Sequence, residues 1–189
     1  MKNSHSTVSL SLLATALLSV TGVSKSAAAD SGNPVGHPPR LTEKKDIQKS
    51  FEMLPEVLKP VSESATLTLF EGLPHQAWEA PALETELASK DTIQRFGFPF
   101  YRKPVQVSDA DTKKLLSIIQ APGAFKEFRG FKGCGGFHPD YSLTWTDGNE
   151  TTEIHLCFGC DEIKAYLNDK EVYCEMGEKT QNEFIHLLK

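Results

Sequence analysis

The sequence predicts an α+β domain, with an antiparallel β-meander over about residues 141–175 and helices from the N-terminal half and the C-terminus packed on one face. Two observations predict this class. Segments in which apolar and polar residues alternate are grouped between Tyr141 and Cys174, and segments with helical apolar periodicity lie mainly before and after them. Strands that are grouped in this way, rather than alternating regularly with helices, are typical of α+β domains.

The N-terminal half is expected to supply three helices and two strands. In chain order these are a short helix capped by Thr42 and kinked or ended at Pro55, a strand over Val61–Glu71, a helix over Ala80–Lys90, an irregular strand over Thr92–Tyr101, and a helix from Ser108 to about Ala121. Gly97 and Pro99 weaken the second strand because they are disfavoured inside a sheet.

The helix after Ser108 has a clear start signal. Ser108 is a good N-cap, and Asp109 and Asp111 lie in the first turn, where the helix dipole favours negative charge. The same two acids are also a conceivable metal ligand pair. Helix capping accounts for them without an ion, so we expect no metal there.

The meander begins with two strands, Tyr141–Thr146 and Thr151–Phe158, joined by a turn that contains Asp147-Gly148. A four-residue loop sets Trp145 opposite Thr152, which gives better cross-strand pairs than a two-residue loop that sets it opposite Glu150. The next segment, Asp161–Asn168, fits either a strand or a helix. We favour the strand because eight residues are few for a helix and Asn168-Asp169 is a turn signal. Thr180–Lys189 is expected to be a helix on the sheet.

The N-terminus has the features of a secretory signal over residues 1–29. Lys2 precedes an apolar run of 13 residues, Val8–Val20, which is shorter than the roughly 20 residues of a membrane-spanning helix. Ala27-Ala28-Ala29 fits a cleavage site before Asp30. We therefore expect a periplasmic or secreted protein without an integral membrane segment after cleavage, a flexible linker over 30–41 and a single domain over 42–189.

The net charge of the chain limits which partners are expected. After cleavage, 18 basic and 25 acidic side chains remain, a net charge of −7. No long basic run is present, so nucleic acid is not an expected partner. The protein partner and the oligomeric state are not predicted.

All four cysteines (Cys134, Cys157, Cys160 and Cys174) lie in one stretch of the chain. In an oxidising compartment an even number favours disulfides, and four cysteines allow three pairings that the sequence does not distinguish. Two structural disulfides are the leading interpretation, and one bond with two buried thiols is a further arrangement. Cys157-Phe-Gly-Cys160 also matches redox and zinc motifs. Its acidic neighbours Asp161 and Glu162 disfavour a reactive thiolate, and no second ligand pair has zinc spacing. No cofactor or metal is expected.

A candidate polar site accompanies the cysteines. His138 and Asp140 flank Pro139 just before the first meander strand, and with Cys134 they form a conceivable nucleophile, base and acid set. Local hydrogen bonding is the commoner role of a histidine in a turn, so no catalytic residue is assigned. His155 lies on the strand face opposite to Ile154 and Leu156.

Three motifs resemble a loosely defined group of small exported bacterial proteins, of the planctomycete type, that have no assigned activity. They are Phe70-Glu-Gly-Leu-Pro-His75, Gly136-Phe-His-Pro-Asp-Tyr141 and Cys157-Phe-Gly-Cys160, within Leu69–Cys174. The resemblance implies an exported bacterial domain and places Glu71, Pro74 and His75 near the cysteine hairpin. It implies no catalytic residues.

The function expected from these observations is a non-enzymatic binding or interaction domain of the cell envelope with structural cysteines. The alternative is a thiol–disulfide or metal-dependent activity centred on Cys157 and Cys160. The pairing of these two cysteines distinguishes the two hypotheses.

Overall fold

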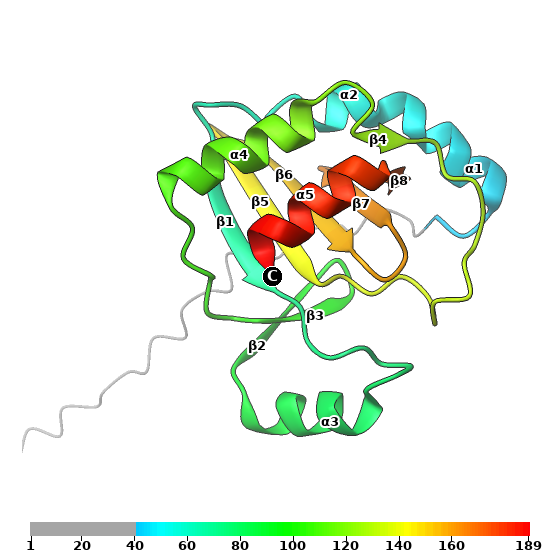
Figure 1. The fold of residues 1–189 in the computed structure, drawn as a ribbon, viewed down its shortest axis with the longest axis vertical. Coiled ribbons are helices and arrows are strands. Elements are labelled where there is room, and N and C mark those ends of the chain that lie inside the picture. The colour runs from blue at the N-terminus through cyan, green and yellow to red at the C-terminus, as the bar shows by residue number, and fades with distance from the viewer. Residues whose placement is uncertain (1–40) are drawn as a thin grey trace, which may run out of the picture. The chain divides into compact units, whose positions relative to one another are not determined.

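A six-stranded antiparallel sheet organises the fold in the computed structural model, which describes residues 41–189 (Figure 1). The strand order is β1-β5-β6-β7-β8-β4, and a separate two-stranded sheet is formed by β2 and β3. The α+β class is therefore confirmed. The predicted signal peptide and the linker up to residue 40 lie outside the described residues.

The meander forms as the alternation predicts. Its strands are β5 (Tyr141–Asp147), β6 (Glu150–Cys157), β7 (Glu162–Leu167) and β8 (Lys170–Met176), each antiparallel to the next. Trp145 pairs with Thr152, as the favoured register requires. The ladder continues to an Asp147–Glu150 pair, so the loop contains only Gly148 and Asn149 and the predicted four-residue loop is wrong. The segment Asp161–Asn168 contains a strand, β7, and not a helix. Asn168 lies in the turn after this strand with a positive φ of 54°. The alternative of a helix directly after Cys160 is thus excluded.

Two further strands flank the meander. β1 (Thr66–Glu71) pairs with β5 and is shorter than predicted, because a turn occupies the residues before it. β4 (Phe125–Lys126), which the sequence patterns did not predict, pairs with the end of β8. The predicted irregular strand is instead a hairpin of β2 (Thr92–Arg95) and β3 (Phe98–Tyr101). Phe96 and Gly97 both have positive φ values, 47° and 82°, which suit its tight turn.

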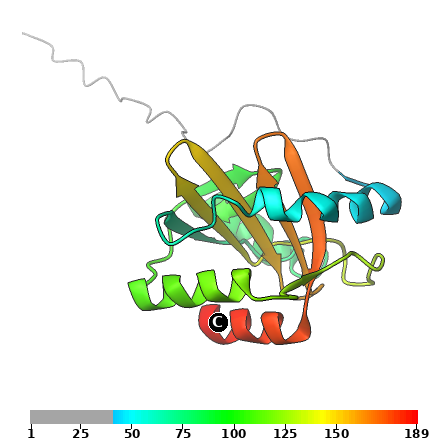
Figure 2. The same cartoon turned by 90° about the horizontal axis from the view of Figure 1, so that it is seen from above.

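One face of the six-stranded sheet carries the main apolar core. Two helices lie side by side on it, α4 (Asp109–Gln120) and α5 (Glu178–Leu188), as Figures 1 and 2 show. Their side chains Leu115, Ile119 and Phe184 pack with strand residues such as Leu143 and Ile154. The Oγ of Ser108 accepts from the backbone N–H of Asp111 at 3.1 Å, so the predicted cap is confirmed.

The other helices differ from the predicted arrangement. α1 (Lys44–Ser50), a 3₁₀ turn (Phe51–Met53) and α2 (Leu54–Val57) replace the single N-terminal helix, and α2 begins with Pro55 in its first turn. The N-cap of α1 is Glu43 without a side-chain bond, so the predicted cap at Thr42 is wrong. The Ser50 hydroxyl accepts from the Tyr173 N–H at 3.1 Å, which satisfies a donor of β8. α3 (Ala80–Ser89) has no buried residue and therefore contributes none to the core.

Candidate functional site

The second face of the sheet is polar and yet buried. Eight polar strand residues on it are less than a tenth exposed: Ser142, Thr144, Glu153, His155, Glu162, Lys164, Glu171 and Glu175. The β2–β3 hairpin covers this face through Arg95 and Phe100, and the loop over residues 127–140 covers it through Arg129 and Phe137. Buried charge is costly unless it is paired, so the charged groups on this face require partners.

The centre of the face is a closed cluster around Glu153. Its Oε1 accepts from Arg95 Nε at 2.8 Å, from the Ser142 hydroxyl at 2.8 Å and from His155 Nε2 at 2.6 Å. Burial opposes ionisation of Glu153, but the hydrogen bond from His155 and the Arg95 guanidinium outweigh it and hold the pKa at about 2. Burial lowers the pKa of His155, so its imidazole is neutral at neutral pH.

His155 is therefore a buried structural residue. Its ring packs against those of Phe96, Phe98, Phe100 and Tyr166, with centroids 5.0–6.0 Å apart. No side chain of the described part of the chain bonds its Nδ1. The ring is 0% exposed and lines neither of the two hollows described below.

A single disulfide joins the loop over residues 127–140 to the turn between β6 and β7. Cys134 and Cys160 are bonded with 5.9 Å between their Cα atoms, whereas Cys157 and Cys174 are buried thiols. The expectation of two disulfides is therefore wrong, and the arrangement with one bond and two thiols is the one present. Sequence spacing could not decide this because the pairing depends on where the loop over residues 127–140 crosses the sheet.

The two thiols are poorly suited to chemistry. Burial raises the pKa of Cys157 to about 11, although the backbone N–H groups of His138 and Cys160 stabilise its thiolate. Burial also raises the pKa of Cys174. The thiolate is the reactive form, so both side chains are inert near neutral pH.

A pocket of about 260 Å³ opens beside the disulfide. Its wall includes Cys134, and six further side chains define its chemistry: Phe131, Lys132, Phe137, Glu162, Lys164 and Tyr173. We call it the Glu162 pocket. Strands β7 and β8 supply its floor, because Lys164 and Tyr173 are cross-strand partners. The covering loop supplies its rim, where Phe131 is 67% exposed.

Glu162 is the distinctive group of this pocket. The Tyr173 hydroxyl donates to its Oε2 at 2.5 Å, while its Oε1 is buried and has no hydrogen-bond partner within residues 41–189. Burial raises the pKa of Glu162, and the Tyr173 bond opposes that rise. Few native proteins leave such an acceptor unsatisfied without a reason.

The two lysines of the pocket already have partners. Lys164 Nζ is 2.6 Å from Glu171 Oε1 and lies over the Tyr173 ring, 4.6 Å from its centroid. Lys132 Nζ donates to the Cys160 carbonyl and is 3.7 Å from Asp161 Oδ2. Their positive charge nevertheless shapes the potential that a ligand meets in the pocket.

The remaining predicted polar residues do not line this pocket. Glu71 is exposed at the end of β1, opposite Tyr141. His75 packs against His138 with ring centroids 4.6 Å apart. His138 Nε2 bonds the Leu73 carbonyl at 2.6 Å, and burial lowers its pKa.

Asp140 has a structural role. It accepts from the Phe158 N–H at 2.8 Å and lies 3.0 Å from Lys189 Nζ. Cys134 is in a disulfide and His138 is bonded to a carbonyl, so the hypothetical set of Cys134, His138 and Asp140 is not assembled as a nucleophile and its base. Within residues 41–189, no three His, Cys, Asp or Glu side chains are placed to hold a metal ion.

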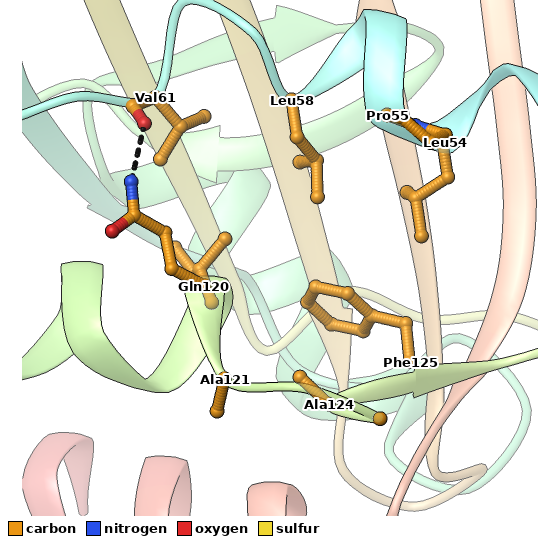
Figure 3. Close-up of a pocket in the computed structure, with 10 residues that line it drawn as sticks. Leu54, Pro55, Leu58, Val61, Gln120, Ala121, Ala124 and Phe125 are labelled. Carbon is orange, nitrogen blue, oxygen red and sulfur yellow. Dashed lines mark hydrogen bonds between the residues drawn. The ribbon is translucent and has the colours of Figure 1, made fainter.

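A second hollow is apolar. It has a volume of about 300 Å³ and lies between α2 and the turn from α4 to β4. Figure 3 shows Leu54, Leu58 and Phe125 pointing into it, and the Gln120 amide bonded to the Val61 carbonyl at its end. With its polar group satisfied in this way, the hollow offers no specific recognition chemistry.

Comparison of the chain with family models, with curated proteins and with solved structures gives no match. None of the helices over residues 41–189 has the length and apolar character needed to span a membrane. The function is therefore inferred from the site itself.

The sequence patterns did not identify the paired and unsatisfied charged groups of the polar face as site residues. Arg95 and Glu153 pair across 58 residues, a relationship that no local motif marks. Glu162 and Lys164 alternate with the apolar residues of β7, which is the usual pattern of a solvated strand face. The only available signal was the succession of charged residues on one face of three adjacent strands.

Proposed function

We propose that this chain is a non-enzymatic binding domain of the bacterial cell envelope, exported to the periplasm or secreted, and that its cysteines are structural. The observation that carries the proposal is the Glu162 pocket, where a buried, unsatisfied acceptor is combined with aromatic walls. Pockets with a few convergent polar groups among aromatic side chains are typical small-molecule sites. The Cys134–Cys160 bond supports this role because it holds the rim of the pocket against the sheet.

Export is supported by the features of residues 1–29 and by the disulfide, since such bonds persist mainly in oxidising compartments. A nucleophilic or redox enzyme is a weaker proposal. Its best candidate, Cys157, is buried with a pKa raised to about 11.

The test combines localisation with ligand mapping. The full chain is expressed in a bacterium with an active export pathway, and the intact mass of the exported product is measured without reductant. We expect a chain that begins at Asp30 and contains one Cys134–Cys160 bond. The labelled product is then titrated with a chemically diverse fragment library, and amide NMR shifts are followed.

Saturable shifts that cluster at Glu162, Lys164 and Tyr173 support the binding role. A product retained in the cytoplasm contradicts export. A Cys157–Cys160 bond that catalyses insulin reduction contradicts the non-enzymatic role and favours the thiol alternative. A library in which no compound shifts these residues contradicts the pocket as the binding site.

A further inference from the structure

We propose that the Glu162 pocket recognises a neutral polyhydroxylated ligand, such as one sugar ring of a saccharide. This inference rests on the proposed binding function and specifies the chemical class of the ligand. Three properties of the pocket carry it: an acceptor without a donor, two lysines that are already paired, and an aromatic lining that includes the exposed Phe131 ring.

The unsatisfied acceptor determines what the ligand has to provide. Glu162 is 1% exposed, and its Oε1 has no donor among the described residues, whereas Tyr173 satisfies its Oε2. Because Oε1 is itself buried, a donor reaches it only when the lining of the pocket shifts, and the ligand then gains a hydrogen bond to a carboxylate, one of the stronger kinds in proteins. A ligand without a donor leaves the acceptor unsatisfied and is rejected.

The charges of the pocket decide which donor is suitable. Lys132 and Lys164 both contribute to its wall, and Lys132 already stabilises the Glu162 charge, so an ammonium or guanidinium ligand meets a carboxylate that is partly compensated. An anion is also disfavoured, because Lys164 is held by Glu171 at 2.6 Å and Lys132 by the Cys160 carbonyl and nearby acids. A neutral hydroxyl donates to Glu162 without displacing either lysine from its partners.

The aromatic walls account for the apolar part of the ligand. Phe137 and Tyr173 meet edge to face with centroids 5.6 Å apart, and Phe128 supports the exposed Phe131 ring at 5.3 Å. A sugar ring presents C–H groups on its faces and hydroxyls on its edge. It therefore suits a site where aromatic surface adjoins a polar acceptor.

The size of the pocket limits how much of the ligand is enclosed. Its volume of about 260 Å³ is just below the range of roughly 300–1,000 Å³ usual for small-molecule sites. One ring fits inside, and further rings of an oligosaccharide extend past Phe131 into solvent.

The test is a titration of the labelled exported protein with four defined probes, read by amide NMR shifts. The two sugars are glucose and N-acetylglucosamine, and the two charged comparators are ethylammonium chloride and sodium acetate. We expect at least one sugar to cause saturable shifts at Glu162, Lys164 and Tyr173, and neither comparator to do so.

Two variants and one control test the assignment. Glu162→Gln removes the carboxylate at nearly constant shape and should weaken sugar binding about tenfold or more. Phe131→Ala changes an exposed side chain, so folding should persist, and it should weaken binding about three- to tenfold. Leu87→Ala, an exposed apolar residue on α3 that does not line the pocket, should leave affinity unchanged.

The outcomes separate this inference from the proposed function. If ethylammonium or acetate binds at these residues and the sugars do not, the ligand class is overturned while the binding site stands. If a fragment from the diverse library binds there but no sugar does, the same conclusion holds. If neither the four probes nor the library shifts these residues, both proposals fail. Equal sugar affinity of the wild type, Glu162→Gln and Phe131→Ala overturns the assignment to this pocket.

Discussion

Arg95 donates from Nε to Oε1 of Glu153 at 2.8 Å and thereby joins the β2–β3 hairpin to a central strand of the six-stranded sheet. Arg95 Nη2 also donates to Oε2 of Glu153 at 2.5 Å and to the Thr144 hydroxyl at 3.0 Å. Both partners of the ion pair are almost fully buried, with side chains 7% and 3% exposed. The hairpin thus covers the polar face by supplying the cation that the buried carboxylate requires.

Arg95→Met should be strongly destabilising, because it leaves the Glu153 carboxylate buried without its cation. Loss of one partner of a buried pair typically costs about 3–5 kcal/mol in the free energy of unfolding. Urea unfolding followed by tryptophan fluorescence measures it. The double variant Arg95→Met with Glu153→Gln should recover part of the loss.

Arg102→Met is the matched control. Its bond to Asp91 lies at the surface, where ion pairs contribute about 0–1 kcal/mol. If the two arginine variants unfold at the same urea concentration, the Arg95–Glu153 pair does not hold the hairpin on the sheet.

Stability should fall with acid in two stages. Burial lowers the pKa of His155 below its ordinary value of 6.5, so below pH 6.5 the unfolded chain binds a proton that the folded protein excludes. The free energy of unfolding is therefore fully retained above pH 6.5 and decreases as the pH falls below it. Glu153 adds a second decrease between about pH 4.5 and 2, as its pKa is lowered from 4.5 to about 2.

His155→Gln tests the first stage, because glutamine keeps a donor for Glu153 but does not titrate. Urea midpoints at several pH values between 7.5 and 5 should show a shallower decrease for the variant than for the wild type. The pKa of His138 is also lowered, so part of the decrease should remain. Identical slopes for the two proteins would show that His155 does not titrate differently in the two states.

The sequence was most informative where local periodicity and burial agree. Leu143 and Trp145 alternate with small polar residues, and the resulting register places them opposite Ile154 and Thr152. Ser108 and Asp111 marked the start of α4 because a cap is a local interaction. In such segments, the neighbours in sequence are also the partners in space.

Long-range relationships could not be predicted in this way. A polar alternation such as Glu162-Ile163-Lys164 has the same pattern whether the polar face meets water or a covering loop. The cover depends on the path of residues 127–140, which Glu175 anchors by accepting from the Arg129 backbone at 2.9 Å. The same path decides that Cys134 reaches Cys160 rather than Cys157.

The disulfide should stabilise the fold by a measurable amount. Replacing Cys134 and Cys160 together by serine removes a bond that closes a loop of 26 residues. The expected loss is about 3 kcal/mol in the free energy of unfolding. Urea unfolding of the oxidised wild type and the double variant measures the difference.

Thiol counting checks the pairing independently. Without reductant, the folded protein should react slowly with a thiol reagent, and the denatured protein should reveal two thiols, Cys157 and Cys174. Denatured protein with no reactive thiol would require a second disulfide, and four thiols would mean that the bond does not form.

Gly72→Ala should destabilise the junction between β1 and the loop before β5. Gly72 donates its N–H to the Asp140 carbonyl at 2.8 Å, and a Cβ at this position would lie 2.0 Å from the Pro139 carbonyl oxygen. Because the obstructing atom is backbone, the two segments have to separate, and overpacking of this kind costs about 1–3 kcal/mol.

The matched control for this substitution is Gly159→Ala. A Cβ at Gly159 meets no atom within 4 Å, and its φ lies outside the left-handed region, so the change should stay within about 0.5 kcal/mol. Thermal unfolding of the two variants compares the same added methyl group at a crowded and an open position. If Gly72→Ala is as stable as Gly159→Ala, β1 and the loop do not pack as closely as the Gly72–Pro139 approach requires. The segment that presents His138 to the Leu73 carbonyl would then be free to move.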